Sequence, residues 1–235
     1  MKPNLRRCLT AEFFGTLLLV ATVVGSGIMA ERLANGNVAL ALLANTIATG
    51  ATLVALILTF GPISGAHLNP VVSVADALEG GLPWSETLAY IFAQVIGGIG
   101  GTILAHAMFS VPVVSLSRHV RSGPAQFVSE FTATFGLLCV IWGCSRSRSN
   151  VVPFAVGTYI TAAYWFTAST SFANPAVTIA RALSDTFAGI RPIDVPPFVT
   201  AQFVGGIAAT LLFRWLVPTL RSSAQDVLVR HQNDI

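Results

Sequence analysis

The stretch Ser171-Phe-Ala-Asn-Pro-Ala-Val-Thr-Ile-Ala-Arg181 decides how the rest of the chain can fold. Asn174 followed by Pro175 is a strong helix-start signal, because the Asn side chain caps the helix and Pro suits its first position. The apolar run that begins there ends near Leu183, about half of the ~20 residues that a membrane-spanning helix needs. We therefore expect a short helix that begins inside the apolar part of the protein and directs its positive end at something buried.

A near copy of this stretch, His67-Leu-Asn-Pro-Val-Val-Ser73, lies about a hundred residues earlier. One Asn-Pro pair could be an ordinary helix start under a surface loop. Two pairs, each inside a long uncharged run, are better explained by two half-helices that face each other across a pore. The pore motifs are then Asn69-Pro70-Val71 and Asn174-Pro175-Ala176.

The composition is that of a membrane protein. Of 235 residues, 54% are hydrophobic and only 10% are charged, whereas soluble domains have about 25% charged residues. The net charge of +3 is small and dispersed, so nucleic acid is not an expected partner. The three cysteines, Cys8, Cys139 and Cys144, have no metal-ligand spacing, and no catalytic or nucleotide motif occurs. We expect no metal, no cofactor and no enzymatic activity.

Six apolar segments are long enough to cross a bilayer. They are residues 9–30, 38–60, 86–109, 126–143, 151–167 and 195–217. With six crossings, eight basic residues fall on the side of the termini (Lys2, Arg6, Arg7, Arg146, Arg148, Arg214, Arg221 and Arg230) and five on the other (Arg32, Arg118, Arg121, Arg181 and Arg191). The positive-inside rule then predicts that both termini are cytoplasmic.

An internal repeat organises these segments. Residues 11–16 are echoed by 129–134, Asn69-Pro by Asn174-Pro, and 93–102 by 201–210. Each half contains three spans and one half-helix, and an odd number of spans forces the second half to enter from the opposite face. We expect one membrane domain over 1–235, with a first repeat over 1–115, a second over 116–220 and a cytoplasmic tail over 221–235. The predicted fold class is all-α, with six transmembrane helices and two re-entrant half-helices from an inverted repeat.

The irregular segments before the two Asn residues must face water or be buried in protein, because backbone at membrane depth needs partners. We expect their carbonyl groups to line the pore as acceptors for a permeating solute. The residues concerned are Gly65, Ala66, His67, Phe172 and Ala173. The Asn69 and Asn174 side chains would cap their helices with oxygen and leave the amide nitrogens as donors toward the pore.

Two acidic residues, Glu12 and Glu130, lie inside apolar spans at matching positions of the repeat. A proton relay or an ion site is one interpretation, since charges within a membrane are commonly functional. The interpretation we favour is that each carboxylate supports the loop before a half-helix by accepting its backbone hydrogen bonds. His67, close to Asn69, is interpreted in the same way, as a support of the loop.

The motifs together resemble those of the aquaporin, or major intrinsic protein, family over nearly the whole chain. They are Ala11-Glu-Phe with Gly15-Thr16, Ser64-Gly-Ala-His-Leu-Asn-Pro70, Ala93-Gln94 with Gly97-Gly98, and Asn174-Pro-Ala176. The resemblance implies an aquaporin-like six-helix bundle, a homotetramer with one pore in each subunit, and passive passage of water, glycerol or similar small molecules across a lipid bilayer.

The sequence departs from the family pattern at two positions. Val71 stands where the family usually has Ala, which we expect to alter packing only. Val177 stands where the family normally places the arginine of its selectivity filter. When the other filter positions are carried over by their spacing from the Asn residues, the resemblance implies a filter of Thr49, Ala162, Ser171 and Val177, all uncharged. Such a filter would be wider than usual and poorer in hydrogen-bond donors.

Arg181 lies one helical turn beyond Val177, on the same stripe as Asn174. It could therefore stand at the pore mouth and attract anions there. The other interpretation is that it extends to the membrane interface or pairs with Asp185, four residues further on.

Val177 followed by Thr-Ile-Ala-Arg181 also resembles a bacterial branch of aquaglyceroporins associated with arsenic resistance. That resemblance implies a passive channel in the bacterial inner membrane for bulky neutral solutes, such as inorganic or methylated arsenic species. Two alternatives stay open: a conventional water and glycerol channel, and an ion-coupled secondary transporter, since inverted repeats also build transporters.

Overall fold

The computed structural model describes residues 4–145 and 149–217, and over these residues every regular element is a helix. The long helices are α1 (Leu5–Leu33), α2 (Val38–Ser64), α4 (Trp84–Phe109), α5 (Pro124–Ser145) and α8 (Val195–Leu216). The shorter ones are α3 (Pro70–Glu79), α6 (Val152–Phe166), α7 (Pro175–Arg181) and the 3₁₀ turns η1 (Ser149–Val151) and η2 (Pro192–Asp194). The expected tail 221–235 and the basic residues Arg146, Arg148, Arg221 and Arg230 lie outside the described residues.

Five helices in the described part are long and apolar enough to cross a membrane: α1, α2, α4, α5 and the segment Pro192–Leu216. The remaining expected span, 151–167, corresponds to α6, which has only 15 residues and a length of about 22 Å. The 3₁₀ turn η1 precedes α6 directly and adds about 6 Å. Together they approach the ~30 Å thickness of a bilayer core.

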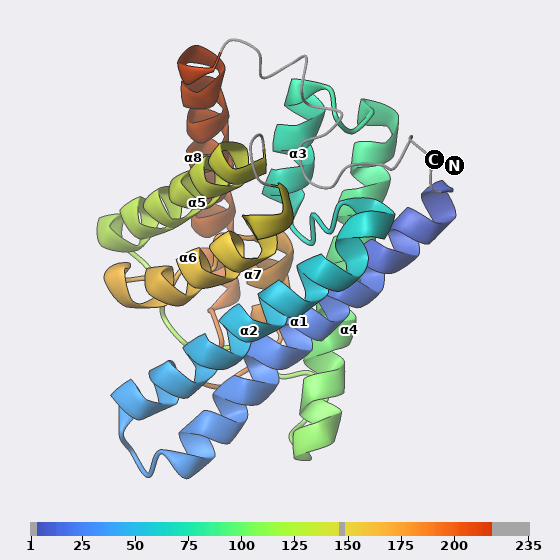
Figure 1. Cartoon of the computed structure of the whole chain (residues 1–235). Helices are drawn as coiled ribbons and strands as arrows, with labels where there is room; N and C mark the ends of the chain where they lie inside the picture. The colour runs from blue at the N-terminus through green and yellow to red at the C-terminus, as the bar shows by residue number, and fades with distance from the viewer. Residues whose placement is uncertain (1–3, 146–148, 218–235) are drawn as a thin grey trace.

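The helices pack in an arrangement that interlocks the two halves of the chain (Figure 1). In the first half α1 packs against α2 and α4, and in the second half α5 packs against α6 and α8. The contacts between the halves run from α2 to α6, from α4 to α7 and from α3 to α8. Each half-helix therefore contacts a long helix of the opposite half.

Glycine sets the closest of these crossings. A Cβ atom on Gly97 of α4 would overlap the backbone oxygen of Phe13 in α1, and one on Gly205 of α8 would overlap that of Phe131 in α5. Between α2 and α6, a Cβ atom on Gly157 would lie 2.7 Å from the oxygen of Gly50. Small residues let apolar helices approach closely in membranes, where packing drives association.

The end of α2 differs from the sequence expectation. Gly61-Pro62 reads as a turn signal, and the second span was expected to end at Phe60. The helix instead continues through Pro62 to Ser64 and is capped by Gly65, whose φ of 86° is left-handed. Proline disrupts the bond to the carbonyl one turn before it, but a helix of 27 residues that is packed on both sides tolerates that loss close to its end.

The half-helices begin where the sequence predicts. Asn69 caps α3 by accepting from the amide of Val71 at 2.9 Å, and Asn174 caps α7 by accepting from Ala176 at 3.0 Å. At 10 and 7 residues, they are about 15 and 10 Å long. Their N-terminal ends meet in the interior of the bundle, and their positive ends face the same place.

Candidate functional site

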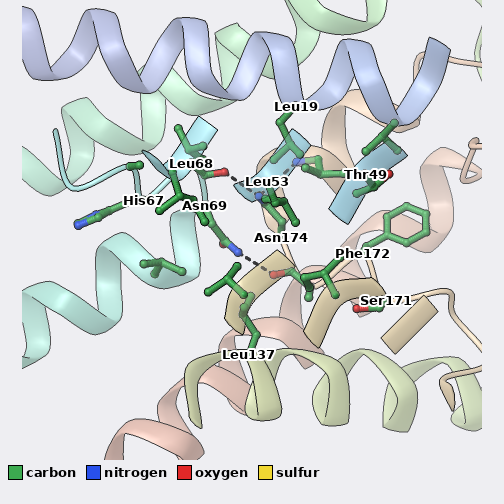
Figure 2. Close-up of a pocket in the computed structure, with 18 of the residues that line it drawn as sticks. Leu19, Thr49, Leu53, His67, Leu68, Asn69, Leu137, Ser171, Phe172 and Asn174 are labelled. Atoms are coloured by element: carbon green, nitrogen blue, oxygen red, sulfur yellow. Dashed lines mark hydrogen bonds between the residues drawn. The ribbon is translucent and has the colours of Figure 1, made fainter. Parts of the chain in front are cut away.

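A narrow cavity of about 70 Å³ runs past the two half-helix starts. At ~10–15 Å³ for each water, it has room for roughly five waters. Its walls are mainly aliphatic and come from α1, α2, α5 and α6. His67 lies toward one end of the drawn site, Thr49 and Ser171 lie toward the other, and Asn69 and Asn174 lie between them (Figure 2). We call these the His67 end and the Ser171 end.

The two asparagines are joined to each other's loops at the middle of the cavity. The Asn69 amide nitrogen donates to the carbonyl of Ala173 at 2.7 Å, and that of Asn174 donates to the carbonyl of Leu68 at 2.7 Å (Figure 2). The sequence led us to expect both amide groups to be free for a solute. One hydrogen of each is instead used to join the halves, which leaves the second one for a molecule in the cavity.

The loops before the asparagines share an uncommon backbone conformation. Ala66 and Leu68 have φ values of 46° and 49°, and Ser171 and Ala173, at the matching positions, have 49° and 47°. Left-handed φ costs a residue with a side chain about 1–2 kcal/mol. Strain repeated at four matched positions is typical of a functional site, where the surroundings hold it.

Four of the five residues expected to present carbonyl groups line the cavity: Ala66, His67, Phe172 and Ala173. The fifth, Gly65, does not, because it ends α2 as its C-cap. The carbonyl of Ala173 already accepts the bond from Asn69. Its second lone pair is the part that remains for a solute.

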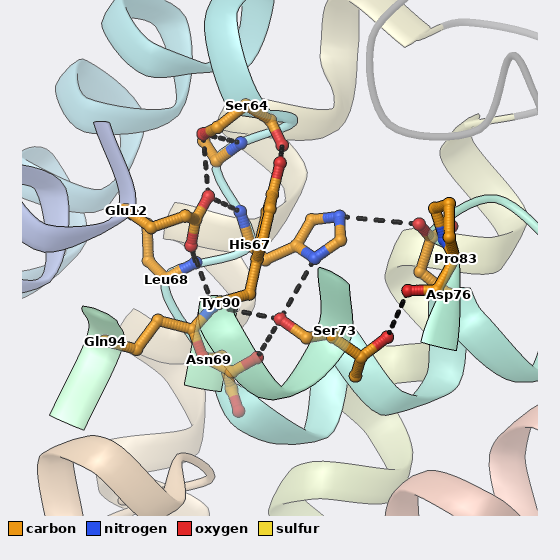
Figure 3. Close-up of polar contacts among 12 residues, drawn as sticks. Glu12, Ser64, His67, Leu68, Asn69, Ser73, Asp76, Pro83, Tyr90 and Gln94 are labelled. Atoms are coloured by element: carbon orange, nitrogen blue, oxygen red, sulfur yellow. Dashed lines mark hydrogen bonds and ion pairs between the residues drawn. The ribbon is translucent and has the colours of Figure 1, made fainter. Parts of the chain in front are cut away.

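Glu12 lies fully buried beside the first loop (Figure 3). Its carboxylate accepts hydrogen bonds from the amides of His67 and Leu68 at 2.9 and 2.7 Å. It also accepts from the side chains of Ser64 and Gln94 at 2.7 and 2.8 Å. With four donors, this carboxylate is arranged as a support for strained backbone.

Glu130 occupies the equivalent place in the second half and is also fully buried. It accepts from the amides of Phe172 and Ala173, each at 2.9 Å, and from the Gln202 side chain at 2.6 Å. These contacts are the ones proposed for a loop support. Neither carboxylate is among the residues that line the cavity.

His67 joins its loop to α3. Its Nδ1 lies 3.1 Å from the Ser73 hydroxyl, and its Nε2 lies 3.6 Å from a carboxylate oxygen of Asp76 (Figure 3). The ring also packs against Tyr90. These contacts fix the ring at one end of the cavity.

At the Ser171 end, three of the four expected filter residues line the cavity: Thr49, Ser171 and Val177. Ala162 does not, and it is exposed on the outside of α6. Ile160 and Tyr164 line the cavity from α6, and they lie one turn apart. Ala162, two residues from each, points about 200° away from them. The Tyr164 hydroxyl lies 3.3 Å from that of Thr49, so Tyr164 is the residue that sequence reasoning missed.

Val71 is accommodated by a glycine of the opposite half. A Cβ atom on Gly206 of α8 would overlap a methyl carbon of Val71. The matching glycine, Gly98 of α4, faces Ala176, and a Cβ atom there would lie 3.2 Å from the Ala176 oxygen. The extra methyl groups of Val71 therefore point into the helix contact between α3 and α8.

Arg181 lines the cavity and is only 2% exposed, so it does not extend to the membrane interface. Its Nε donates to the carbonyl of Ala188, and its guanidinium carbon lies 3.4 Å from the ring centre of Phe172. Asp185, the possible partner four residues on, pairs with the exposed Arg118 instead. Arg181 therefore lies in the cavity wall. It neither extends to the membrane interface nor pairs with Asp185.

Arg121 is a second buried arginine at this end, and nothing in its spacing singled it out. It lies in the connection between α4 and α5, with 8% exposure, and its guanidinium carbon is 5.0 Å from the same Phe172 ring. Its side chain donates to the carbonyls of Gly189 and Ser169 at 2.9 and 3.1 Å. Burial lowers the pKa of Arg121 to about 10, so it remains protonated at neutral pH.

The model of the major intrinsic protein family matches the chain over residues 1–172 and again over residues 149–234. The chain belongs to the major intrinsic protein family. It is therefore a multi-pass membrane channel.

Individual relatives agree with this assignment. Aquaglyceroporin AqpS of Rhizobium meliloti (strain 1021) is 56% identical over 216 residues, which cover 92% of each chain. The probable aquaporin NIP7-1 of Arabidopsis thaliana is 30% identical over 216 residues, which cover 90% of this chain and 77% of the relative.

A solved structure supports the fold. The aquaglyceroporin of Plasmodium falciparum superposes with a TM-score of 0.74, over 92% of this chain and 99% of that one, at 20% sequence identity. At this identity the likeness bears on the fold alone. The predicted fold class, an all-α aquaporin-like bundle with two half-helices, is confirmed.

Proposed function

We propose that the cavity is a passive permeation path for small uncharged polar solutes larger than water, of the kind that aquaglyceroporins take. The observation that carries this proposal is the composition of the Ser171 end. Thr49, Ser171, Val177 and Tyr164 line it, and a valine stands where the family normally has an arginine. The arginine of this wall, Arg181, comes from the next turn of α7 and lies against the Phe172 ring. The names of several relatives, including a glycerol uptake facilitator, point the same way.

The middle of the cavity favours neutral solutes over cations. Two half-helix N-termini face this point, which makes the local potential positive. The second hydrogens of Asn69 and Asn174 are donors, and the loop carbonyls are acceptors. A polyol or a neutral hydroxide can use both kinds of group, whereas a hydrated cation is repelled.

The width of the Ser171 end sets the upper size of the solute. Valine at 177 removes a charged fork with five donors and replaces it with two methyl groups. We propose that the resulting filter admits solutes bulkier than glycerol, and neutral arsenic hydroxides and methylated arsenic species are the chemical class that the sequence resemblance suggests. The conventional alternative is a channel restricted to water and glycerol.

Reconstitution into proteoliposomes tests this proposal. Uptake of glycerol and of neutral arsenous acid should exceed that of empty vesicles, should not saturate in the millimolar range and should need no ion gradient. Uptake that depends on a proton or sodium gradient would instead favour an ion-coupled transporter. Equal rates with and without protein would contradict the proposal.

Val177→Arg is the variant that tests the filter. We expect it to reduce arsenous acid uptake by about tenfold or more and to affect water less, because the longer side chain narrows the Ser171 end and adds a charge. Val114→Arg is the matched control, since Val114 is 54% exposed in the connection between α4 and α5. It should leave both rates unchanged. If Val177→Arg leaves the solute rate unchanged as well, residue 177 does not form the constriction.

We also propose that the protein is located in a bacterial inner membrane, with both termini cytoplasmic, and that it assembles as a homotetramer. The cavity lies within one chain, so each subunit would have a path of its own. The support for this assembly is the family membership. Crosslinking in native membranes and labelling of introduced terminal cysteines from each side would test the two points separately.

A further inference from the structure

Two buried arginines contact one aromatic ring, that of Phe172, at the Ser171 end. The guanidinium carbon of Arg181 lies 3.4 Å from the ring centre of Phe172, and that of Arg121 lies 5.0 Å from it. Cation–π contacts of this kind hold a guanidinium in place. The two positive charges are thus fixed close together beside the cavity.

No carboxylate neutralises either arginine within the described residues. In that part of the chain their side chains contact backbone carbonyls, a threonine hydroxyl and the Phe172 ring. The acids of this region have other partners. Asp185 pairs with Arg118, and Glu130 accepts hydrogen bonds from loop amides and from Gln202. Asp194 pairs with Arg191, and from Arg121 it accepts only the backbone amide. Buried charges in proteins are normally paired, so this end carries uncompensated positive charge.

Hydrogen-bond donors at the same place lack partners. A guanidinium has five N–H groups, and in the described part of the chain Arg181 uses one of them, on Nε. Its two terminal nitrogens have no hydrogen-bond partner there, and the residue lines the cavity. The Ser171 hydroxyl is buried, lines the same cavity and has no hydrogen-bond partner there. An unpaired buried hydroxyl is costly, and a bound ligand would satisfy it.

We propose that the Ser171 end is a binding site for a small oxyanion, held by the terminal nitrogens of Arg181 and the hydroxyl of Ser171. Arg121, which contacts the same Phe172 ring, supplies a second positive charge nearby. The planar fork of an arginine matches two oxygens of a carboxylate or of a tetrahedral oxyanion such as phosphate. The cavity volume of about 70 Å³ limits the ligand to a few heavy atoms.

This site is distinct from the path for neutral solutes in what it recognises. A neutral polyol needs the amides of Asn69 and Asn174 in the middle of the cavity, whereas the oxyanion needs the Arg181 cation and the Ser171 hydroxyl at its end. Binding at the Ser171 end does not require passage through the middle of the cavity. The inference therefore stands or falls independently of the proposed function.

Thermal unfolding of the purified full-length protein in neutral detergent tests the site. Sodium formate, sodium phosphate and sodium chloride are compared at equal ionic strength and pH. We expect formate, phosphate or both to raise the midpoint temperature of unfolding, with a saturable dependence on their concentration. A ligand that binds only the folded state stabilises that state. Chloride should not do so. The formate and phosphate arms show whether a planar or a tetrahedral oxyanion fits.

Three variants locate the effect. Arg181→Gln and Ser171→Ala should each weaken the oxyanion response at least tenfold, as expected for a lost bond to a charged group. Arg118→Gln is the matched control, since its side chain is 92% exposed, and it should respond as the wild type does. If Arg181→Gln fails to fold, Ser171→Ala still decides, because its hydroxyl has no protein partner to lose.

Two results would overturn the inference: no oxyanion-specific shift in the wild type, or an unchanged affinity in Ser171→Ala together with Arg181→Gln. Glycerol uptake by the same preparations is measured in parallel. Oxyanion binding without glycerol uptake would count against the proposed function alone, and uptake without binding would count against the oxyanion site alone.

Discussion

Glu12 and Glu130 show how a single side chain can hold a strained loop. Each accepts two backbone amides at the two residues before an asparagine, one of which is in the left-handed region. Each is also fixed by a glutamine from a neighbouring long helix, Gln94 or Gln202. Each carboxylate thus joins a loop to two long helices of its own half.

Glu130→Gln should therefore destabilise the protein by about 2–4 kcal/mol, because an amide nitrogen would face backbone donors in a buried site. Thermal unfolding in detergent measures this loss. Glu31→Gln, at an exposed position near the end of α1, is the control and should change little. If Glu130 were instead a proton relay, Glu130→Gln would keep the stability and lose a gradient-dependent flux.

The asparagine starts, the supporting acids and Val177 could all be predicted from the sequence, because each is marked by a motif or a repeat. The α6 residues that line the cavity could not. Ala162 was expected to line the cavity because its distance along the sequence from Asn174 was carried over from the family pattern. In the structure, the rotation of α6 about its axis turns Ile160 and Tyr164 toward the cavity and leaves Ala162 exposed. The role of Arg121 could not be predicted from the sequence either. Its contact with Phe172 depends on the path of the connection between α4 and α5.

The contact between α3 and α8 depends on a matched pair of residues. Val71 is larger than its counterpart Ala176, and Gly206 leaves the space that its methyl group fills. The contact between α7 and α4 uses Ala176 with Gly98 in the same way, with a smaller side chain. The two half-helices are thus seated by different residue volumes.

Gly206→Ala should destabilise the protein by about 1–3 kcal/mol through overpacking. Val71→Ala in the same chain should restore most of this loss, because it removes the methyl group that the new Cβ meets. Gly98→Ala combined with Val71→Ala is the control pair, and here no rescue is expected. Additive effects in the Gly206 pair, measured as shifts in Tm, would show that the two residues do not share a contact.

The half-helix starts and the approximate spans follow from hydrophobic runs and Asn-Pro signals. The boundary at Gly61-Pro62 was wrong because a turn signal says only that a helix is weakened there. The packing of α2 against α1 and α6 carries the helix three residues past Gly61, and Gly65 ends it through its left-handed backbone.

Across the whole molecule, the two halves are joined by more than apolar packing. Arg214, on α8 near the end of the second half, forms an ion pair with Glu79 at the end of α3 and donates to the Leu78 carbonyl at 2.7 Å. The Glu79 side chain is fully buried, with 0% exposure. This pair lies in a contact between halves that the repeat pattern alone does not predict.

Arg214→Leu should lower the stability by about 3–5 kcal/mol, because it leaves the Glu79 carboxylate buried without its partner. Adding Glu79→Leu should recover most of the loss, since a buried pair is often replaceable by apolar residues. The control is Arg118→Leu, which breaks an exposed pair with Asp185 and should change the stability by less than about 1 kcal/mol. A double variant as unstable as Arg214→Leu would contradict this account.

The crossed amides of Asn69 and Asn174 have a mechanical consequence. Each half of the chain holds the other's loop in the middle of the cavity, so neither half can tilt away without breaking both bonds. A carrier that opens to one side at a time would have to break and re-form these two hydrogen bonds in every transport cycle. If the two hydrogen bonds stay intact, the solute moves by its own diffusion. The temperature dependence of the transport rate should then be close to that of diffusion in water.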